Sequence, residues 1–153
     1  MSKILAEKLF NYKGVIYFGV PEETNNLSLS GGERKTNNAT ILAIQEHGSP
    51  VKNIPPRELL QPVLKKYERQ IQKSFERVLV SLMNGDEDGA NREMERLAIR
   101  VEGWAKKFFT DIDNNWVPNA PSTIKAKGSD RPLIDTGSLR AAIRAIFDPE
   151  GRR

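Results

Sequence analysis

Two long stretches of the chain place apolar residues three or four positions apart, which puts them on one face of a helix. The first, about residues 57–83, carries the series Leu60, Leu64, Tyr67, Ile71, Phe75, Val78 and Leu82, widened by Leu59, Val63, Leu79 and Met83. The second, about residues 90–111, carries Met94, Leu97, Val101, Trp104 and Phe108, with Ala98 and Ala105 alongside. The pattern predicts two amphipathic helices, with Phe75, Trp104 and Phe108 in a core.

The two helices are expected to pack against each other. A helix over residues 57–83 would be roughly 40 Å long, whereas a compact domain of this size has a radius of gyration of about 15 Å. Such a helix needs a partner along its length. The polar segment 84–89 between the helices lacks the final glutamate of a calcium-binding loop. We therefore predict an antiparallel helical hairpin over residues 57–111.

A strand is predicted near the N-terminus, over Tyr12–Val20. This segment is rich in β-branched and aromatic residues, and Pro21 ends it because proline lacks an amide donor. Residues 143–148 fit either a continuing helix or a second strand with alternate residues on one face: Ile143, Ala145 and Phe147. The predicted fold class is α+β, with a long antiparallel helical hairpin packed on a small antiparallel β-sheet and a short capped C-terminal helix.

The C-terminal helix has a start signal in the sequence. Asp135 and Thr136 have short side-chain oxygens that cap a first helical turn. Leu133 and Ile134 precede them and form an apolar plug that fastens the helix start to the core. Apolar residues then recur at helical spacing: Leu139, Ala142, Ile143 and Ile146.

The remaining segments are shorter or polar. A helix is predicted over Thr40–His47, with Asn38 or Thr40 as its cap and Gly48 at its end. Residues 22–38 predict a long polar loop or hairpin. The sequence leaves open whether this is a contact loop that orders in an assembly or a plain mobile loop. The first eleven residues fit a short helix or an extended arm.

Length and composition limit the class of protein. A chain of 153 residues suits a single domain over residues 1–153. Its 24 Lys and Arg against 20 Asp and Glu give a net charge of +4, unlike the dense positive run of a dedicated nucleic-acid-binding protein. The absence of cysteine excludes disulfides and cysteinyl metal sites. No apolar run reaches the about 18 residues of a membrane span, so a soluble chain is expected.

The sequence predicts no catalytic or metal site. His47 is the single histidine, and it supports neither a zinc site nor a catalytic triad without partners at motif spacing. Gly31 and Gly32 lack the lysine of a phosphate-binding loop. The acidic residues alternate with basic ones on helix surfaces. We therefore expect no enzyme activity, no cofactor and no bound metal; a hydrolase would need a nucleophile and a base that this pattern does not supply.

Two segments together resemble a family of tailed-bacteriophage proteins. After Trp116, residues 120–143 read Ala-Pro-Ser-Thr-Ile-Lys-Ala-Lys-Gly-Ser-Asp-Arg-Pro-Leu-Ile-Asp-Thr-Gly-Ser-Leu-Arg-Ala-Ala-Ile. Residues 39–48 read Ala-Thr-Ile-Leu-Ala-Ile-Gln-Glu-His-Gly, and residues 54–57 read Ile-Pro-Pro-Arg. In this order, the segments are similar to those of the tail-completion, head–tail joining or virion morphogenesis proteins.

The resemblance implies a structural virion protein at the neck or the head-proximal end of the tail, present in the host cytoplasm during assembly. It implies a homomeric, hexameric ring that completes or terminates the tail and joins it to the head. The implied partners are further copies of the chain, the tail tube or tail terminator protein, and head connector or neck proteins, with no membrane. The implied signature residues are Trp116, Leu133, Ile134, Asp135, Thr136, Gly137, Leu139 and Arg140.

A basic segment keeps a second function open. Lys125, Lys127 and Arg131 surround Gly128 and predict a small basic loop. The sequence leaves open whether this is a plain solvated loop or an edge that faces the neck channel or an acidic neighbouring subunit. Three charges would grip phosphate only weakly and in a salt-sensitive way. The alternative function is a nucleic-acid-associated protein acting on packaged phage DNA, which steeply salt-dependent duplex binding would identify.

Overall fold

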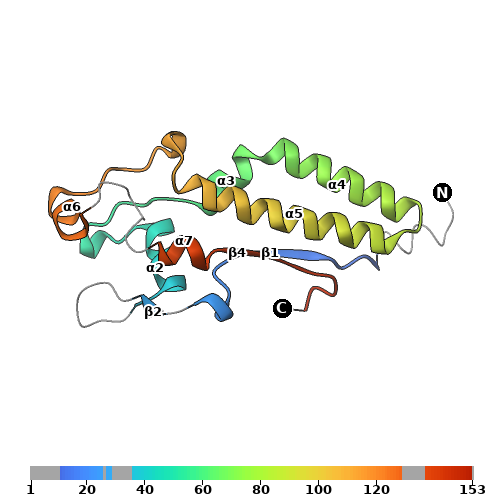
Figure 1. Ribbon diagram of the computed structural model, residues 1–153, viewed down its shortest axis with the longest axis horizontal. Coiled ribbons are helices and arrows are strands. Elements are labelled where there is room, and N and C mark those ends of the chain that lie inside the picture. The colour runs from blue at the N-terminus through green and yellow to red at the C-terminus, as the bar shows by residue number, and fades with distance from the viewer. Residues whose placement is uncertain (1–10, 26, 29–35, 129–136, 153) are drawn as a thin grey trace.

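The computed structural model describes residues 11–25, 27–28, 36–128 and 137–152. Two long helices, α4 (Glu68–Met83) and α5 (Glu87–Phe108), lie over a two-stranded antiparallel sheet of β1 (Val15–Gly19) and β4 (Arg144–Asp148). The turn between α4 and α5 lies at one end of this unit, and the shorter helices gather at the other (Figure 1). The predicted α+β fold, a helical hairpin on a small sheet with a short C-terminal helix, is confirmed.

The first predicted helix is broken in two, so the prediction of one helix over residues 57–83 was wrong. Helix α3 (Leu60–Lys66) ends at Tyr67, whose φ of −108° and ψ of 17° interrupt the helix before α4. The Tyr67 ring stacks on Trp104 of α5, with the ring centroids 4.3 Å apart. The bend lets α3 and α4 both contact α5. Hydrophobic spacing alone does not reveal such a bend.

The predicted turn between the long helices is confirmed. Gly85 has a φ of 74°, which glycine adopts without steric strain. Asp86 is the N-cap of α5, and its Oδ1 accepts a hydrogen bond from the Gly89 amide at 2.8 Å. The carboxylate thus satisfies an amide that has no partner within the helix.

Residues 144–148 form strand β4, which settles the alternative that the sequence left open. β4 pairs with β1 in antiparallel register, with Tyr17 opposite Ile146 and Phe18 opposite Ala145. Because side chains alternate along a strand, Ala145 and Phe147 share the face that packs on the core residues of α5. Both strands of the sheet therefore contact α5.

Helix α2 (Asn38–His47) confirms the predicted helix, although its cap was predicted wrongly. The N-cap is Asn37, whose Oδ1 accepts a hydrogen bond from the Thr40 amide at 2.8 Å. Asn38 is instead the first helical residue and is buried. Gly48, with a φ of 71°, ends the helix as predicted.

Within the predicted loop 22–38, the described residues include a short ladder. Strands β2 (Leu27–Ser28) and β3 (Thr36–Asn37) pair in antiparallel fashion, as a hairpin would require. Single turns of 3₁₀-helix complete the described connections: η1 (Glu22–Thr24), η2 (Pro50–Lys52) and η3 (Ile112–Asn114).

Two short helices follow the hairpin in sequence, α6 (Pro121–Lys127) and α7 (Ser138–Ala142). The expected caps of the C-terminal helix, Asp135 and Thr136, lie outside the described residues. The observed N-cap of α7 is Gly137, with a φ of 76° and no side-chain cap hydrogen bond. The chain therefore enters α7 through a left-handed glycine.

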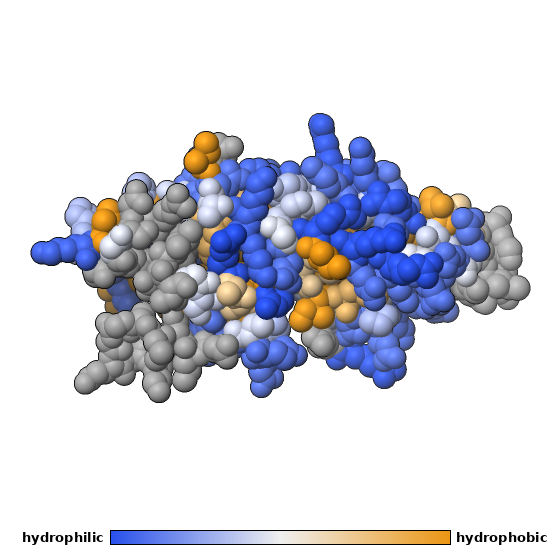
Figure 2. All heavy atoms as spheres, in the orientation of Figure 1, coloured by the Kyte–Doolittle hydropathy of each residue, from blue (hydrophilic) through white to orange (hydrophobic). Residues whose placement is uncertain are grey.

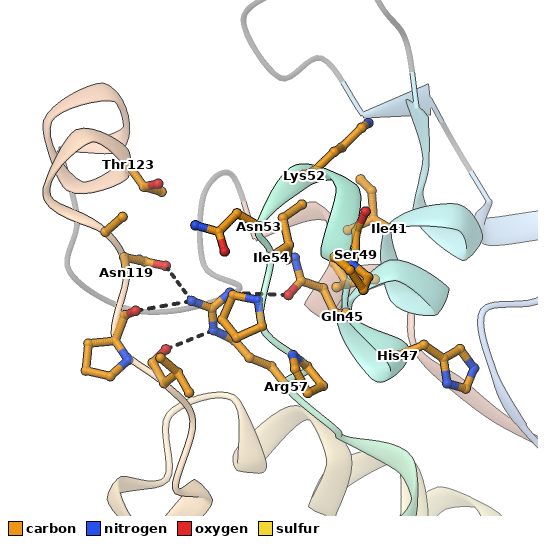
Figure 3. A pocket seen from close by; sticks show the side chains of 18 of the residues that line it. Ile41, Gln45, His47, Ser49, Lys52, Asn53, Ile54, Arg57, Asn119 and Thr123 are labelled. Carbon is orange, nitrogen blue, oxygen red and sulfur yellow. Dashed lines mark hydrogen bonds between the residues drawn. The ribbon is translucent and has the colours of Figure 1, made fainter.

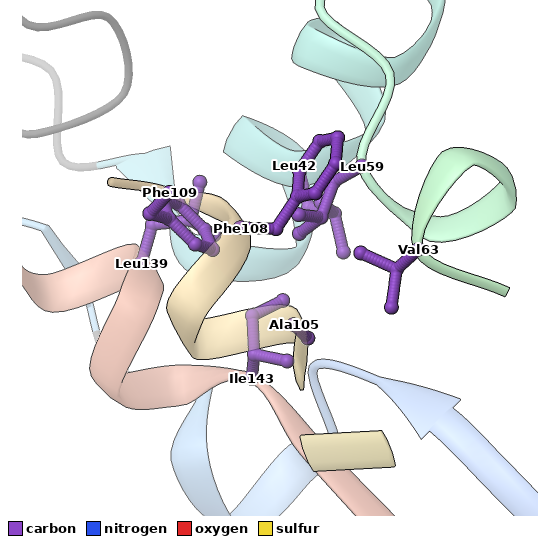
Figure 4. Packing of buried hydrophobic residues seen from close by; sticks show 8 residues of the cluster. All are labelled: Leu42, Leu59, Val63, Ala105, Phe108, Phe109, Leu139 and Ile143. Atoms are coloured by element: carbon purple, nitrogen blue, oxygen red, sulfur yellow. The ribbon is translucent and has the colours of Figure 1, made fainter. Parts of the chain in front are cut away.

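Buried apolar residues form three clusters along α5. The first joins α2, α3, α5 and α7 and contains Leu42, Leu59, Val63, Ala105, Phe108, Phe109, Leu139 and Ile143 (Figure 4). The second contains Val78, Leu82, Ala90 and Met94, and the third contains Leu97, Ala98, Val101 and Ala145. Trp104 is partly buried and packs against the first and third clusters, so the predicted core positions of Trp104 and Phe108 are confirmed.

The prediction of Phe75 as a core residue was wrong. Phe75 is 45% exposed, and Leu79 and Met83 on the same helical face are 52% and 54% exposed. Val78 and Leu82 of the same helix are buried. Helix α4 packs mainly on one helix, α5, which covers only a narrow strip of its surface. Phe75, Leu79 and Met83 are therefore only partly covered by the described part of the chain.

Among the described residues, none of the helices has the length and apolar character that crossing a membrane requires.

Candidate functional site

The two segments that carry the family resemblance meet at one cleft of about 880 Å³. Its walls come from residues 45–57 and 117–123, and Gly137, Ser138 and Leu139 of the C-terminal signature also line it. Figure 3 shows α2 and the chain after it on one side, and α6 with the loop before it on the other, with Arg57 between them. Segments 60 residues apart in the chain therefore build one site.

Arg57 joins the two walls of the cleft and is only 7% exposed. Its Nε donates to the Val117 carbonyl at 2.9 Å, and its Nη2 donates to the Pro118 carbonyl at 3.3 Å. Longer contacts reach the side-chain oxygens of Gln45, at 3.4 Å, and Asn119, at 3.5 Å. Arg57 therefore holds the loop before α6 against the end of α2.

Arg57 has no acidic hydrogen-bond partner within the described part of the chain. Its acceptors are neutral oxygens, and it forms no ion pair with any carboxylate that the structure describes. Burial lowers the pKa of the Arg57 guanidinium, because desolvation disfavours the charged form. Lys52 adds an exposed cation to the lining, whose described residues include no aspartate or glutamate. The charged side chains among the described lining residues, Lys52 and Arg57, are therefore both basic.

Glu46 lies beside the cleft, and its side chain caps the start of helix α3. One of its carboxylate oxygens, Oε1, accepts hydrogen bonds from the amides of Leu59 and Leu60, at 2.7 and 3.1 Å. First-turn amides lack partners inside their own helix, and a negative charge there also suits the helix dipole. Glu46 thus caps a helix that begins 14 residues later in the chain.

Replacing Glu46 with alanine is expected to lower the free energy of unfolding by about 1–3 kcal/mol, because two amides at the start of α3 lose their acceptor. Urea unfolding followed by circular dichroism measures this change. Glu95→Ala is the matched control, since Glu95 is exposed on α5 and its loss should change the free energy by less than about 0.5 kcal/mol. Equal losses for the two variants would contradict the capping role.

Trp116 is partly buried and packs against the first core cluster. Its ring meets Phe108 and Phe109 edge-on, with centroids 5.6 and 5.8 Å apart. Its Nε1 donates to the Glu58 carbonyl at 2.8 Å. Trp116 therefore fastens the loop that leads into the cleft to the segment before α3.

The C-terminal signature lies only partly within the described residues, because Leu133, Ile134, Asp135 and Thr136 fall outside them. Gly137 starts α7, and Leu139 is buried in the first core cluster. Arg140 is exposed, and its Nε donates to the Lys106 carbonyl at 2.8 Å. The described signature residues thus attach α7 to α5 and to the core.

One buried polar pair was missed from the sequence. Asn38 is 1% exposed, and its side chain hydrogen-bonds that of Ser138 at 3.2 Å, across 100 residues of chain. The pair ties the start of α2 to the start of α7. The local sequence signal for Asn38 was its place in the pair Asn37-Asn38 at the start of α2. Asparagine is also a common helix cap, so the sequence suggested a capping role for Asn38 instead.

The predicted basic loop is partly a helix. Lys125 and Lys127 belong to α6, and Gly128 ends that helix with a φ of 67°. Lys125 is exposed, whereas Arg131 lies outside the described residues. Pro121 at the first position suits a helix start, and this signal outweighed the polar, loop-like composition.

No group of three or more histidine, cysteine, aspartate or glutamate side chains in the described part of the chain is placed to hold a metal ion. His47 lies at the end of α2 and is exposed. Its ring points away from Arg57 (Figure 3). The ring of His47 is therefore not directed at the Arg57 guanidinium.

Part of the chain is similar to part of an archaeal protein. The chain is 35% identical to an uncharacterized protein, MJ0331, of Methanocaldococcus jannaschii over 74 residues. That match covers 45% of this chain and 55% of the archaeal protein, so the chain spans about half the length of its relative. No protein-family model matches the chain. No solved structure matches it either.

Proposed function

We propose that this chain is a structural subunit of a tailed-bacteriophage virion. In this proposal, copies of the chain form a homomeric, hexameric ring at the neck or the head-proximal end of the tail. The ring completes or terminates the tail and contacts the tail tube or terminator protein on one side and the head connector on the other. The placement in a virion rests on the resemblance carried by residues 39–57 and 116–143.

The half-exposed apolar face of α4 supports the assembly part of the proposal. Phe75, Leu79 and Met83 are four residues apart, so they form one stripe along the helix, and each is about half exposed. Ile99, on the neighbouring helix α5, is 72% exposed. Figure 2 shows mostly hydrophilic side chains over the viewed face, with apolar side chains in separate groups. A row of half-exposed apolar side chains along one helix supports contact with another protein.

Light scattering on the purified chain, alone and then with isolated tails, tests the proposal. A ring-sized mass, or a monomer that incorporates only at tube ends, is the expected result. A monomer that ignores tails and binds duplex DNA with a steep salt dependence would overturn the proposal in favour of a nucleic-acid-associated protein. The exposed Lys125 on α6 is the described residue that this alternative would use.

Leu79→Glu is expected to raise the protein concentration needed for assembly by at least about tenfold. The substitution would place a charge inside an apolar contact. The free energy of unfolding should change by less than about 1 kcal/mol, since Leu79 is half exposed. Light scattering over a concentration series, or the fraction bound to tails, measures the effect.

Val51→Glu is the matched control for this change. Val51 is 99% exposed and lies in η2, away from α4. The same substitution there should leave assembly unchanged. If Val51→Glu weakened assembly as much as Leu79→Glu, the contact would not run through the α4 stripe.

A further inference from the structure

The cleft around Arg57 holds a buried cation that forms no ion pair with any carboxylate of residues 11–25, 27–28, 36–128 and 137–152. Buried charges in proteins are normally paired, because removing a charge from water without compensation is unfavourable. Here the guanidinium meets only neutral oxygens, and its Nη1, which carries two N–H groups, has one acceptor, Gln45 Oε1, among the described residues. Arg57 therefore keeps both a charge and a hydrogen-bond donor for an incoming anion.

The other polar groups of the cleft suit a peptide main chain. Side-chain amides come from Gln45, Asn53 and Asn119, and hydroxyl groups come from Ser122 and Thr123. Asn53 has a left-handed backbone, with a φ of 53°, and Figure 3 shows its side chain directed toward the cleft. Amides and hydroxyls both donate and accept hydrogen bonds, as an extended peptide requires.

We propose that this cleft binds an extended acidic segment of a partner protein, with one carboxylate on Arg57. A carboxylate there forms a charge-assisted hydrogen bond, which is stronger than a neutral one. Lys52, at the rim, attracts a second acidic residue of the same segment. The volume of about 880 Å³ exceeds the needs of a single small anion and matches sites that enclose larger ligands. This inference does not depend on the virion proposal, because it concerns one chain and one peptide.

The test is a titration of the full-length, ¹⁵N-labelled chain with two synthetic peptides, followed by nuclear magnetic resonance. One peptide is acetyl-Gly-Ser-Glu-Ser-Glu-Ser-Gly-amide, and the other has glutamine in place of both glutamates. The glutamate peptide should shift the side-chain amide signals of Asn53 and Asn119 and the Nε–H signal of Arg57. It should bind at least about tenfold more tightly than the glutamine peptide. Equal binding, or no shifts, would overturn the inference.

Two charge-reversal variants separate the cleft from general attraction to a basic chain. Lys52→Glu changes the rim of the cleft, whereas Lys73→Glu makes the same charge change on an exposed position of α4. We expect Lys52→Glu to weaken the binding of the glutamate peptide about fivefold or more. Lys73→Glu should weaken that binding by less than about twofold. Equal effects would show non-specific attraction and overturn the inference. Normal mass and spectra of both variants confirm that each is folded.

Discussion

Phe108→Ala is expected to lower the free energy of unfolding by about 3–5 kcal/mol. Phe108 is 4% exposed, in the first core cluster at the end of α5. Its loss leaves a cavity beside Leu59 and Val63 and removes the edge-on contact with Trp116. Since Trp116 holds the loop that builds one wall of the cleft, the fluorescence of the native state should change as well. Urea unfolding with fluorescence detection measures both effects.

Phe75→Ala supplies the control with the same change of side chain. Phe75 is 45% exposed on α4, so its removal should lower the free energy of unfolding by less than about 1 kcal/mol. A large loss would indicate that Phe75 is buried in solution, for example by self-association. In that case the loss would grow with protein concentration, because association stabilises the folded state by mass action.

Arg57→Leu is expected to lower the free energy of unfolding by about 2–4 kcal/mol. The substitution leaves the Val117 and Pro118 carbonyls without the donors that they now have in part-buried hydrogen bonds. A hydrogen bond to a charged group contributes about 1.5–3 kcal/mol. The loss should be concentrated in one region, because Arg57 joins two loops. Native-state hydrogen exchange should therefore show faster exchange in residues 117–123 than in α5.

Arg96→Leu is the control for the loss of an arginine. Arg96 is exposed on α5, and its ion pair with Glu93 lies at the surface. Surface ion pairs contribute at most about 1 kcal/mol, so the free energy of unfolding should change little. Hydrogen exchange should not become faster in any particular loop. If Arg96→Leu destabilised the chain as much as Arg57→Leu, the proposed role of Arg57 as the tie between the cleft walls would fail.

In the cleft, two residues belong to segments noticed in the sequence, but their physical roles became clear only in the structure. Glu46 and Arg57 both stood in the quoted segments, yet local spacing suggested nothing for either side chain. Their roles depend on partners far along the chain, since Glu46 caps α3 and Arg57 binds carbonyls of the loop before α6. A residue whose partners are non-local leaves no periodic signal, so only the assembled structure reveals it.

The amino-acid sequence by itself determined the elements that depend on local rules. Helix α5, the turn before it, the N-terminal strand and the glycine end of α2 all followed from apolar spacing, strand-forming residues and turn residues, because these act within a few positions of the chain. The mixed fold followed in turn, since a long amphipathic hairpin has to cover an apolar sheet.

The tertiary structure alone decided the features that depend on which surfaces meet. Tyr67 breaks the predicted helix where its ring stacks on Trp104, and residues 144–148 become a strand because β1 offers a partner. Phe75 fits the same helical pattern as Val78 but remains exposed, because one neighbouring helix covers only part of α4. Periodicity shows which face of a helix is apolar, but the number and position of its neighbours decide how much of that face is buried.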